Sequence, residues 1–289
     1  MPRWCRRAPR RAPPRLPSSP DGNPALTLSK GPLSATPPDA TNYRVDGPEH
    51  RLLFEAFPRR VRAVLGSQTV LDSNRAKLLH ESAHLPQLYV PREDVRDDLL
   101  EATDHTTHCP FKGDASYWSV RAGDRVAENA VWGYPEPLEE SAWQLDHLAF
   151  YWSAMDGWFD EDEEVQGHFC DPYHRIDVRD SSRRVRVLAD GEVVAETDRP
   201  KLLSEIGLPN RFYIYSEDVR RDALGPSAKH TTCPYKGVAS YHTLAVGDRR
   251  IEDGAFFYPE PFDGARRIRD HLCFYGEGIE TEVDGERVE

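Results

Sequence analysis

The stretch RRVRVLADGEVVAET, residues Arg183–Thr197, predicts two short β-strands joined by a tight turn. Apolar and polar residues alternate on each side of Asp190-Gly191, as they do in a strand with one buried face. An Asp-Gly pair between two such runs is the strongest short-range signal for a two-residue β-hairpin. Gly66-Ser67 occupies the corresponding place in an earlier copy of this pattern. Antiparallel β-structure is therefore the expected architecture.

The residues that follow this hairpin predict one helix and further strands. RPKLLSEIG resembles a short helix, with Asp198 as its N-cap and Gly207 as its end. RFYIYSEDV is rich in aromatic and β-branched residues, and a second hairpin is expected around Gly247-Asp248. An aromatic run then ends at the prolines of Tyr258-Pro-Glu-Pro, because proline cannot donate to a strand ladder.

The same signals occur twice, because the chain repeats itself at a fixed offset of 124 residues. About 42 of roughly 118 aligned positions are identical without a gap, which indicates duplication of a whole domain. The pairs that define the register include Cys109 with Cys233, Tyr134 with Tyr258 and Asp146 with Asp270. We expect a first unit at residues 48–165, a linker at 166–171 and a second unit at 172–289, with contact between the two units.

Each unit is predicted to be a small, mainly β domain with one or two short helices, closer to an antiparallel barrel or sandwich than to a wound α/β fold. Residues 1–47 lie outside the repeat and are rich in proline and arginine, so we expect a disordered tail. The tail could serve an acidic partner or act as a targeting peptide, and an idle extension is the alternative.

Composition narrows the class of protein. The chain holds 49 acidic and 37 basic residues, for a formal net charge of −12. This balance argues against general nucleic-acid binding, which needs clustered Lys and Arg to neutralise phosphate. No apolar run approaches the roughly 20 residues that span a bilayer, and none follows the basic N-terminus as a secretory signal requires. A cytoplasmic protein without nucleic-acid or membrane partners is expected.

The five cysteines are scattered along the chain without a Cys-x-x-Cys pair. This spacing predicts neither a disulfide framework nor a structural zinc site. Free thiols are expected, and no metal or other cofactor is assigned.

The most distinctive repeated stretch reads HTTHCPFKGDASY at residues 105–117 and HTTCPYKGVASY at residues 230–241. Pro110 fixes φ at about −65° and Gly113 admits positive φ, so a tight turn is expected that aims backbone amides and Lys112 in one direction. Such convergent donors suit an anionic or carbonyl-bearing ligand. Lys236 is the second copy, and a simply solvated lysine is the alternative.

Cys109 and Cys233 are either reactive thiols or packing residues. A lysine three residues further on could lower the pKa of each thiol and make it a nucleophile or a redox centre. No histidine keeps its place beside both cysteines, because His108 aligns with Thr232. This favours a small buried thiol that packs the turn.

Tyrosines and glutamates complete the candidate site. They could form the rim of a rigid pocket, with an aromatic face for stacking and a carboxylate for a hydrogen bond. Alternatively, Tyr-Pro-Glu-Pro only ends an edge strand. The full candidate set for ligand binding is Cys109, Lys112, Tyr117, Tyr134 and Glu136 in the first unit, and Cys233, Lys236, Tyr241, Tyr258 and Glu260 in the second.

The two units differ in their tryptophans. All six lie at or before Trp158, and Trp132 and Trp143 align with Phe256 and Arg267. If each unit has a pocket, the two pockets have diverged in lining and ligand, or one copy is only structural.

The combination of TTCPYKGVASY, FYPEP and DHLCFY resembles the domain of unknown function 427 family, and TTHCPFKGDASY, WGYPEP and DHLAFY match it in the first unit. The resemblance covers both repeats. It implies compact, mainly β domains, tent-like or barrel-like, that occur in tandem.

A nucleotidyltransferase label attached to this family implies a Gly-Ser turn followed by paired aspartates that hold magnesium. Neither feature survives in both units. The matching residues are Gly66-Ser67 and Asp160-Glu161-Asp162, and their copies are Asp190-Gly191 and Asp284-Gly285-Glu286. An acidic run beside a linker is usually a solvated face.

Three functions remain open. The leading expectation is a protein that binds an unidentified small polar or anionic molecule in an aromatic-lined pocket. The second is an enzyme with cysteine- and lysine-based chemistry or nucleotidyl-transfer-like activity. The third is a protein-interaction scaffold, which predicts no preformed pocket.

Overall fold

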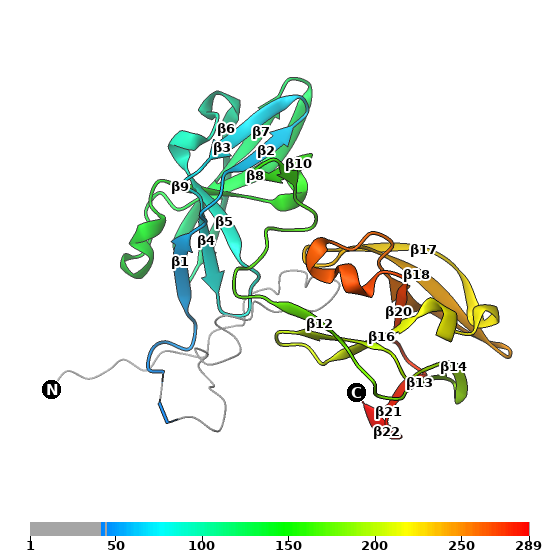
Figure 1. Ribbon diagram of the computed structural model, residues 1–289. Coiled ribbons are helices and arrows are strands. Elements are labelled where there is room, and N and C mark those ends of the chain that lie inside the picture. Colours follow the sequence, from blue (N-terminus) through cyan, green and yellow to red (C-terminus); the bar gives the residue numbers. More distant parts are fainter. Residues whose placement is uncertain (1–41, 44, 289) are drawn as a thin grey trace.

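The computed structural model describes residues 42–43 and 45–288. Two β-rich units follow one another along the chain, with strands at residues 52–164 in the first and 176–288 in the second (Figure 1). Most of the predicted tail, residues 1–47, lies outside the described residues. None of the described helices is long and apolar enough to cross a membrane.

The first unit combines a seven-stranded sheet with a four-stranded sheet, and all neighbouring strands pair antiparallel. In order across the large sheet, the strands are β1 (Leu52–Ala56), β4 (Lys77–Glu81), β5 (Gln87–Pro91), β9 (His147–Phe150), β8 (Arg125–Gly133), β7 (Gly113–Ala122) and β6 (Leu100–Cys109). The small sheet consists of β11 (Glu163–Glu164), β10 (Gly157–Asp160), β2 (Val61–Leu65) and β3 (Gln68–Ser73).

The second unit repeats this topology. Its large sheet has the order β12 (Ile176–Asp180), β15 (Lys201–Glu205), β16 (Arg211–Tyr215), β20 (His271–Phe274), β19 (Arg249–Phe257), β18 (Gly237–Val246) and β17 (Leu224–Cys233). Its small sheet consists of β14 (Glu192–Thr197), β13 (Val185–Ala189), β21 (Ile279–Val283) and β22 (Glu286–Val288). The duplication seen in the sequence is therefore a duplication of the fold.

Short 3-10 turns take the place of the predicted short helices. In the described part of the chain these turns are three or six residues long, and each lies in a connection between two strands. They are η1 (Arg92–Asp94), η2 (Asp97–Leu99), η3 (Glu139–Gln144), η4 (Trp152–Ala154), η5 (Ser216–Asp218), η6 (Arg221–Ala223) and η7 (Asp263–Ile268).

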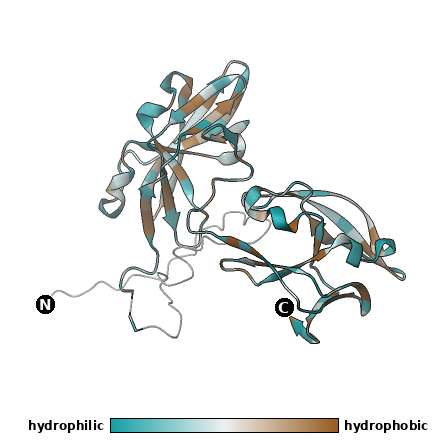
Figure 2. Ribbon diagram, viewed as in Figure 1, coloured by the Kyte–Doolittle hydropathy of each residue, from teal (hydrophilic) through white to brown (hydrophobic). Residues whose placement is uncertain are grey.

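The predicted mainly β, antiparallel architecture is confirmed, but the sheets are not closed into barrels. In each large sheet the two outermost strands, β1 and β6 or β12 and β17, lie at opposite edges and do not pair. The large sheet packs one face against the small sheet and buries apolar side chains between them, as Val61 with Val131 and Val185 with Leu244 illustrate. Apolar and polar residues accordingly alternate along many strands in Figure 2.

Both predicted hairpins are present. Asp190 and Gly191 join β13 to β14 with φ of 51° and 85°, and two positive φ values give the turn whose twist matches paired strands. Gly247, with φ of 56°, begins the turn between β18 and β19.

The predicted helix at RPKLLSEIG is wrong, because Lys201–Glu205 forms strand β15 between β12 and β16. Burial alternates along its second half, with Leu203 and Glu205 buried and Ser204 between them less so. A segment this short gains little from a helix, whose first turn is costly to nucleate. Pairing on both sides satisfies its backbone groups instead.

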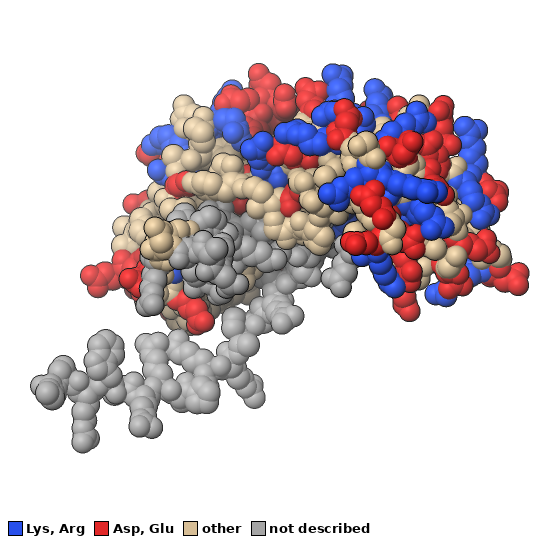
Figure 3. All heavy atoms as spheres, turned by 60° about the horizontal axis from the view of Figure 1, so that its bottom comes forward, with Lys and Arg blue, Asp and Glu red and all other residues tan. Residues whose placement is uncertain are grey.

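The described surface carries charges of both signs. Figure 3 shows Lys and Arg beside Asp and Glu over much of one face, with an area of uncharged residues next to them. Many of these charges form exposed ion pairs, such as Arg199 with Asp218 and Arg121 with Glu101. Exposed pairs of this kind contribute little to stability, about 0–1 kcal/mol each.

Candidate functional site

Each large sheet turns one face away from its small sheet, and we call this the outer face. In the first unit its buried residues are Leu79, Tyr89, Ala115, Tyr117, Tyr134 and Ala149. In the second unit they include Val178, Leu203, Tyr213, Ala239, Tyr241, Phe256, Tyr258 and Cys273. The repeated tyrosines and cysteines of the candidate set therefore lie on a single face of each unit.

The Cys-Pro-aromatic-Lys-Gly stretch is a tight turn that connects β6 to β7 at one end of the outer face. The Lys112 amide donates to the Cys109 carbonyl at 3.3 Å, and Gly113 follows with φ of 102°. A Cβ on Gly113 would lie 3.2 Å from the carbonyl oxygen of Glu136. The turn and the Tyr-Pro-Glu-Pro segment are therefore in backbone contact, which only glycine permits here.

A buried ion pair and a histidine anchor this turn in the first unit. The Lys112 ammonium contacts Glu81, and the side chains of Lys112 and Glu81 are 9% and 12% exposed. His50 Nε2 lies 2.9 Å from the other oxygen of Glu81, and the His50 ring stacks on Phe111 with centroids 3.7 Å apart. Sequence reasoning placed Lys112 in the site but missed Glu81.

The second unit repeats the arrangement, with Tyr235 in the place of Phe111. Lys236 Nζ lies 2.5 Å from one oxygen of Glu205, and His174 Nε2 lies 2.9 Å from the other. His174 stacks on Tyr235, with centroids 4.1 Å apart. Glu81 and Glu205 each lie two residues after KLL and are identical in the repeat, and this was the available signal in the sequence.

The charges in this triad compensate one another. Burial on its own would raise the pKa of Glu81, but Lys112 and His50 outweigh burial and leave that pKa below its ordinary value of 4.5. The pKa of Glu205 is lowered in the same way, by His174 and Lys236 against burial. Both lysines are thus held by a carboxylate, which fixes the position of the turn.

Tyrosines and a cysteine gather beside the triad. Cys109, Tyr117 and Tyr134 pack in one cluster of the first unit, and the Tyr117 hydroxyl is hydrogen-bonded to Thr107 at 2.9 Å. Burial strongly raises the pKa of Tyr134, so its hydroxyl keeps its proton. The second unit likewise gathers Cys233, Tyr241 and Tyr258.

The glutamates of Tyr-Pro-Glu-Pro do not join these clusters. The side chains of Glu136 and Glu260 are exposed to solvent, although their backbone carbonyls contact the turns. The structure therefore brings together the cysteines, lysines and tyrosines of the candidate set and leaves the two carboxylates outside.

Four cysteines fall in the described residues, and all four are free thiols. Burial raises the pKa of Cys233 and of Cys273, and it raises the pKa of Cys170 to about 11. A raised pKa reduces the thiolate fraction near neutral pH, and the thiolate is the nucleophile.

Each outer face also buries a polar side chain that has no hydrogen-bond partner among the described residues. In the second unit this is the hydroxyl of Tyr213, whose side chain is fully buried beside Phe256. In the first unit it is the amide of Gln144, which is also fully buried and aligns with Ile268 of the outer-face cluster. Unpartnered buried groups are rare in folded proteins.

Linker residues cover the turn of the second unit. The Cys170 thiol donates to the Pro234 carbonyl at 3.3 Å, and the Asp171 amide donates to the Tyr235 hydroxyl at 2.9 Å. The Tyr173 hydroxyl, just beyond the linker, donates to Glu55 on β1 of the first unit at 2.7 Å. This segment thus contacts both units.

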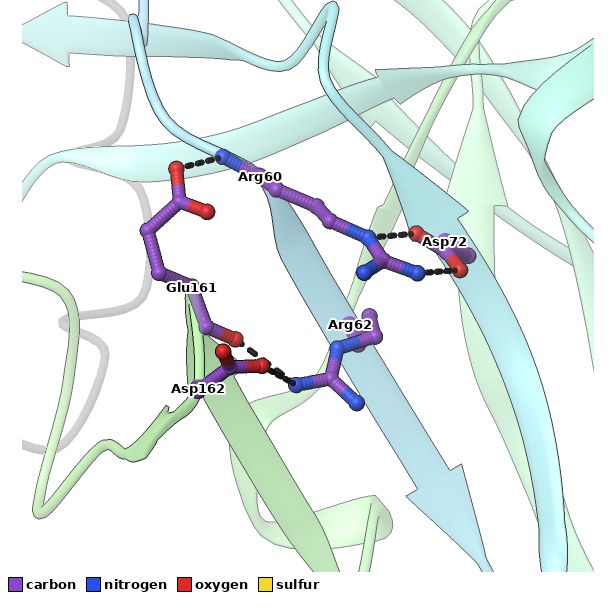
Figure 4. A network of polar contacts seen from close by, with 5 residues as sticks. All are labelled: Arg60, Arg62, Asp72, Glu161 and Asp162. Atoms are coloured by element: carbon purple, nitrogen blue, oxygen red, sulfur yellow. Dashed lines mark hydrogen bonds and ion pairs between the residues drawn. The ribbon is translucent and has the colours of Figure 1, made fainter.

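The acidic run that resembled a magnesium site is engaged by arginines. Asp162 accepts from Arg62 at 3.1 Å, and the Glu161 carboxylate accepts from the backbone amide of Arg60 at 2.9 Å (Figure 4). Asp160 pairs with another arginine, Arg59, at 2.7 Å. These carboxylates therefore point to separate partners on the small sheet. Within the described residues, no group of three or more His, Cys, Asp or Glu side chains is arranged to hold a metal ion.

Two shallow surface hollows occur in the second unit. One, of about 410 Å³, is lined by Asp180, Ser181, Arg199, Lys201, Tyr215 and His271, and lies at the other end of the large sheet from the turn. The second, of about 470 Å³, is lined by Arg184, Glu196, Thr197, Asp198, Arg199 and Asp218. Neither hollow includes a residue of the candidate set.

A model of a known protein family matches both units of the chain. The model of the family described as Domain of unknown function (DUF427) matches residues 53–161 and again residues 177–289, so it covers most of the chain in two tandem copies. A search of curated proteins found no match to this chain.

Proposed function

Because the chain belongs to the domain of unknown function 427 family, whose description states no activity, we propose a function from the geometry of the outer faces. We propose that the protein binds small molecules and that the outer face of each unit is a ligand-binding surface. Tyrosine and cysteine side chains form the floor of the surface, and the His–Glu–Lys triad holds the turn that borders it.

The observation that carries this proposal is the pair of buried polar side chains without partners. A buried hydroxyl or amide that makes no hydrogen bond costs about 1–3 kcal/mol, so folds rarely retain one. Here one lies on each outer face, Tyr213 in the second unit and Gln144 in the first. A ligand that supplies the missing partner recovers this cost on binding.

The repeated triads support the same reading. Burying an ion pair seldom stabilises a fold more than apolar residues of similar size would, because desolvation offsets the attraction. Both units nevertheless keep it, at Glu81 with Lys112 and at Glu205 with Lys236. In the proposed site, the ion pair holds the turn and its backbone amides at the edge of the ligand.

Cysteine-based catalysis is the alternative, and the second unit disfavours it. Burial raises the pKa of Cys233, and Lys236, three residues further on, forms an ion pair with Glu205. In the first unit, the neighbouring His108 is exposed and its ring bonds Asp114 at 2.6 Å. Neither cysteine therefore has an adjacent histidine poised to accept its proton, as nucleophilic thiols require.

The proposal is tested by a thermal-shift screen of the full chain against organic acids, amino acids, nucleotides and sugars at millimolar concentration. A compound that binds only the folded state raises the melting temperature, by the equivalent of about 2.7 kcal/mol when present at 100 times its Kd. We expect at least one compound whose shift is lost in Gln144→Ile or in Tyr213→Phe.

The matched control is Gln68→Leu, a half-buried glutamine on β3 of the small sheet. It should leave every shift unchanged. If no compound raises the melting temperature, or if the shifts persist in both outer-face variants, the outer faces are not ligand sites.

A further inference from the structure

The two outer faces carry different charges. The offset of 124 residues aligns Gln87 with Arg211 and His105 with Lys229, so two positions around the same tyrosines become basic in the second unit. Lys229 Nζ lies 4.6 Å from the centre of the Tyr241 ring and 3.5 Å from Asp253. Asp253 aligns with Asn129 and offsets the charge of Lys229, so Arg211 is the net addition of positive charge at these positions.

Among the described residues, Arg211 has no carboxylate within ion-pair distance, although Glu205 is close enough to raise its pKa. Its half-buried guanidinium lies 6.0 Å from the centre of the Tyr275 ring and beside the Cys273 thiol. It forms no ion pair with any Asp or Glu of the described residues, whereas Arg267 nearby pairs with Asp180 at 2.6 Å. A half-buried guanidinium is normally paired, because removing its charge from water is costly.

The unpartnered Tyr213 hydroxyl lies next to this cation. Arg211 and Tyr213 are two positions apart on β16, so both side chains project from the outer face. A tyrosine hydroxyl without an acceptor and a guanidinium that bonds only the Cys273 thiol thus occur side by side, in a cluster of aromatic rings. A single anionic group would accept from both.

The first unit has no unpartnered hydrogen-bond donor at the corresponding positions, Gln87 and Tyr89. Gln87 satisfies its amide by donating to the Leu88 carbonyl at 3.1 Å. Tyr89, the counterpart of Tyr213, is also buried, but it has a hydrogen bond with Trp132. Burial raises the pKa of Tyr89, and this hydrogen bond partly offsets the rise. Phe256 replaces that tryptophan in the second unit and offers no hydrogen bond. At this position, the tyrosine hydroxyl is therefore unpartnered in the second unit and not in the first.

We infer that the outer face of the second unit binds a small organic carboxylate. The carboxylate lies between Arg211 and Tyr213, and its apolar body lies against Phe256 and Tyr275. A guanidinium donates two parallel hydrogen bonds to a planar carboxylate, and the tyrosine hydroxyl donates a further one. The inference rests on the proposed function, because it names the ligand class for one of the two outer faces.

The test is isothermal titration calorimetry of the full chain with acetate, benzoate and phenylacetate. The corresponding neutral amides and inorganic phosphate serve as comparison ligands. We expect at least one carboxylate to bind with one site per chain, about tenfold or more tighter than its amide, since the amide lacks the charge that pairs with Arg211. Phosphate should bind more weakly than that carboxylate.

Arg211→Gln introduces the residue found in the first unit, and we expect it to weaken carboxylate binding by about tenfold or more, because the charge-assisted hydrogen bonds are lost. Tyr213→Phe should weaken binding without lowering the melting temperature of the ligand-free chain. Arg269→Gln, at an exposed position, is the control and should bind as the wild type does.

Three results would overturn the inference: no carboxylate binds, phosphate or an amide binds as tightly, or Arg211→Gln binds the carboxylate unchanged. If Arg211→Gln leaves carboxylate binding unchanged and Gln144→Ile abolishes it, the ligand lies on the first unit. The assignment of the carboxylate site to the second unit would then be wrong, whereas the proposed function would stand.

Discussion

Lys112 forms an ion pair with Glu81, a residue 31 positions earlier, and Lys236 repeats the pair with Glu205. The turn that carries Lys112 leads into β7, whereas Glu81 ends β4, and β5, β9 and β8 lie between them in the sheet. Strands four spacings apart would be about 19 Å apart in a flat sheet. The ion pair therefore requires each large sheet to curve around its outer face, which makes that face concave.

Glu81→Gln should destabilise the protein markedly. It leaves the Lys112 ammonium buried without a full counter-charge, and breaking a buried pair in this way costs about 3–5 kcal/mol. Glu205→Gln should have a similar effect on the second unit. Urea unfolding followed by circular dichroism measures both.

The matched control is Glu101→Gln, which breaks an exposed pair with Arg121. It should cost no more than about 1 kcal/mol. Equal effects of Glu81→Gln and Glu101→Gln would show that the buried pair does not fix the turn.

The triads also predict how stability depends on pH. The pKa of Glu81 and of Glu205 is below 4.5 in the folded chain, so each unfolded carboxyl binds its proton at a higher pH than the folded one. Their contribution is therefore complete above 4.5 and is lost as the pH falls through the folded pKa. The difference in unfolding free energy between wild type and Glu81→Gln should shrink as the pH is lowered below 4.5. A difference that stays constant down to a pH of about 3 would contradict this assignment.

The buried thiols should react slowly. Burial raises the pKa of Cys170, Cys233 and Cys273, so each carries less thiolate than free cysteine does near neutral pH. Iodoacetamide labelling, followed by peptide mass spectrometry, should be slower at these three sites than for free cysteine, and unfolding in urea should remove the difference. Labelling of Cys233 faster than free cysteine would favour the catalytic alternative.

Gly113→Ala should loosen the turn. Gly113 has φ of 102°, and a Cβ would lie 3.2 Å from the Glu136 carbonyl, so both strain and a close contact oppose alanine. We expect a loss of about 1–3 kcal/mol. Gly123→Ala is the comparison, because Gly123 has φ of 65° and no atom within 4 Å of the added Cβ. Melting temperatures that fall equally in the two variants would show that the contact with Glu136 does not matter.

Much of the fold could be predicted from local signals. Asp190-Gly191 predicts its hairpin because both residues must adopt positive φ, and few other pairs do so readily. The strand at Lys201–Glu205 could not be predicted in this way, because its conformation depends on partners on both sides and not on its own propensity.

The site was only partly predictable for a related reason. Cys109, Lys112 and Tyr117 stand close together in a repeated motif, and the chain brings them to one face. Glu81 lies 31 residues before Lys112, and only the curvature of the sheet brings the two together. Tyr213 is an ordinary strand tyrosine in the sequence, and its missing partner is visible only in three dimensions.

The most direct test of the central claim compares Tyr213→Phe with Tyr241→Phe in the ligand-free protein by urea unfolding. Both hydroxyls lie on the second outer face, but that of Tyr241 is hydrogen-bonded to Thr231 at 2.7 Å and that of Tyr213 has no partner among the described residues. Tyr241→Phe should cost about 1 kcal/mol, and Tyr213→Phe should leave the protein at least as stable as the wild type. A Tyr213→Phe variant destabilised as much as Tyr241→Phe would mean that the Tyr213 hydroxyl is already satisfied, which would contradict a site that awaits its ligand.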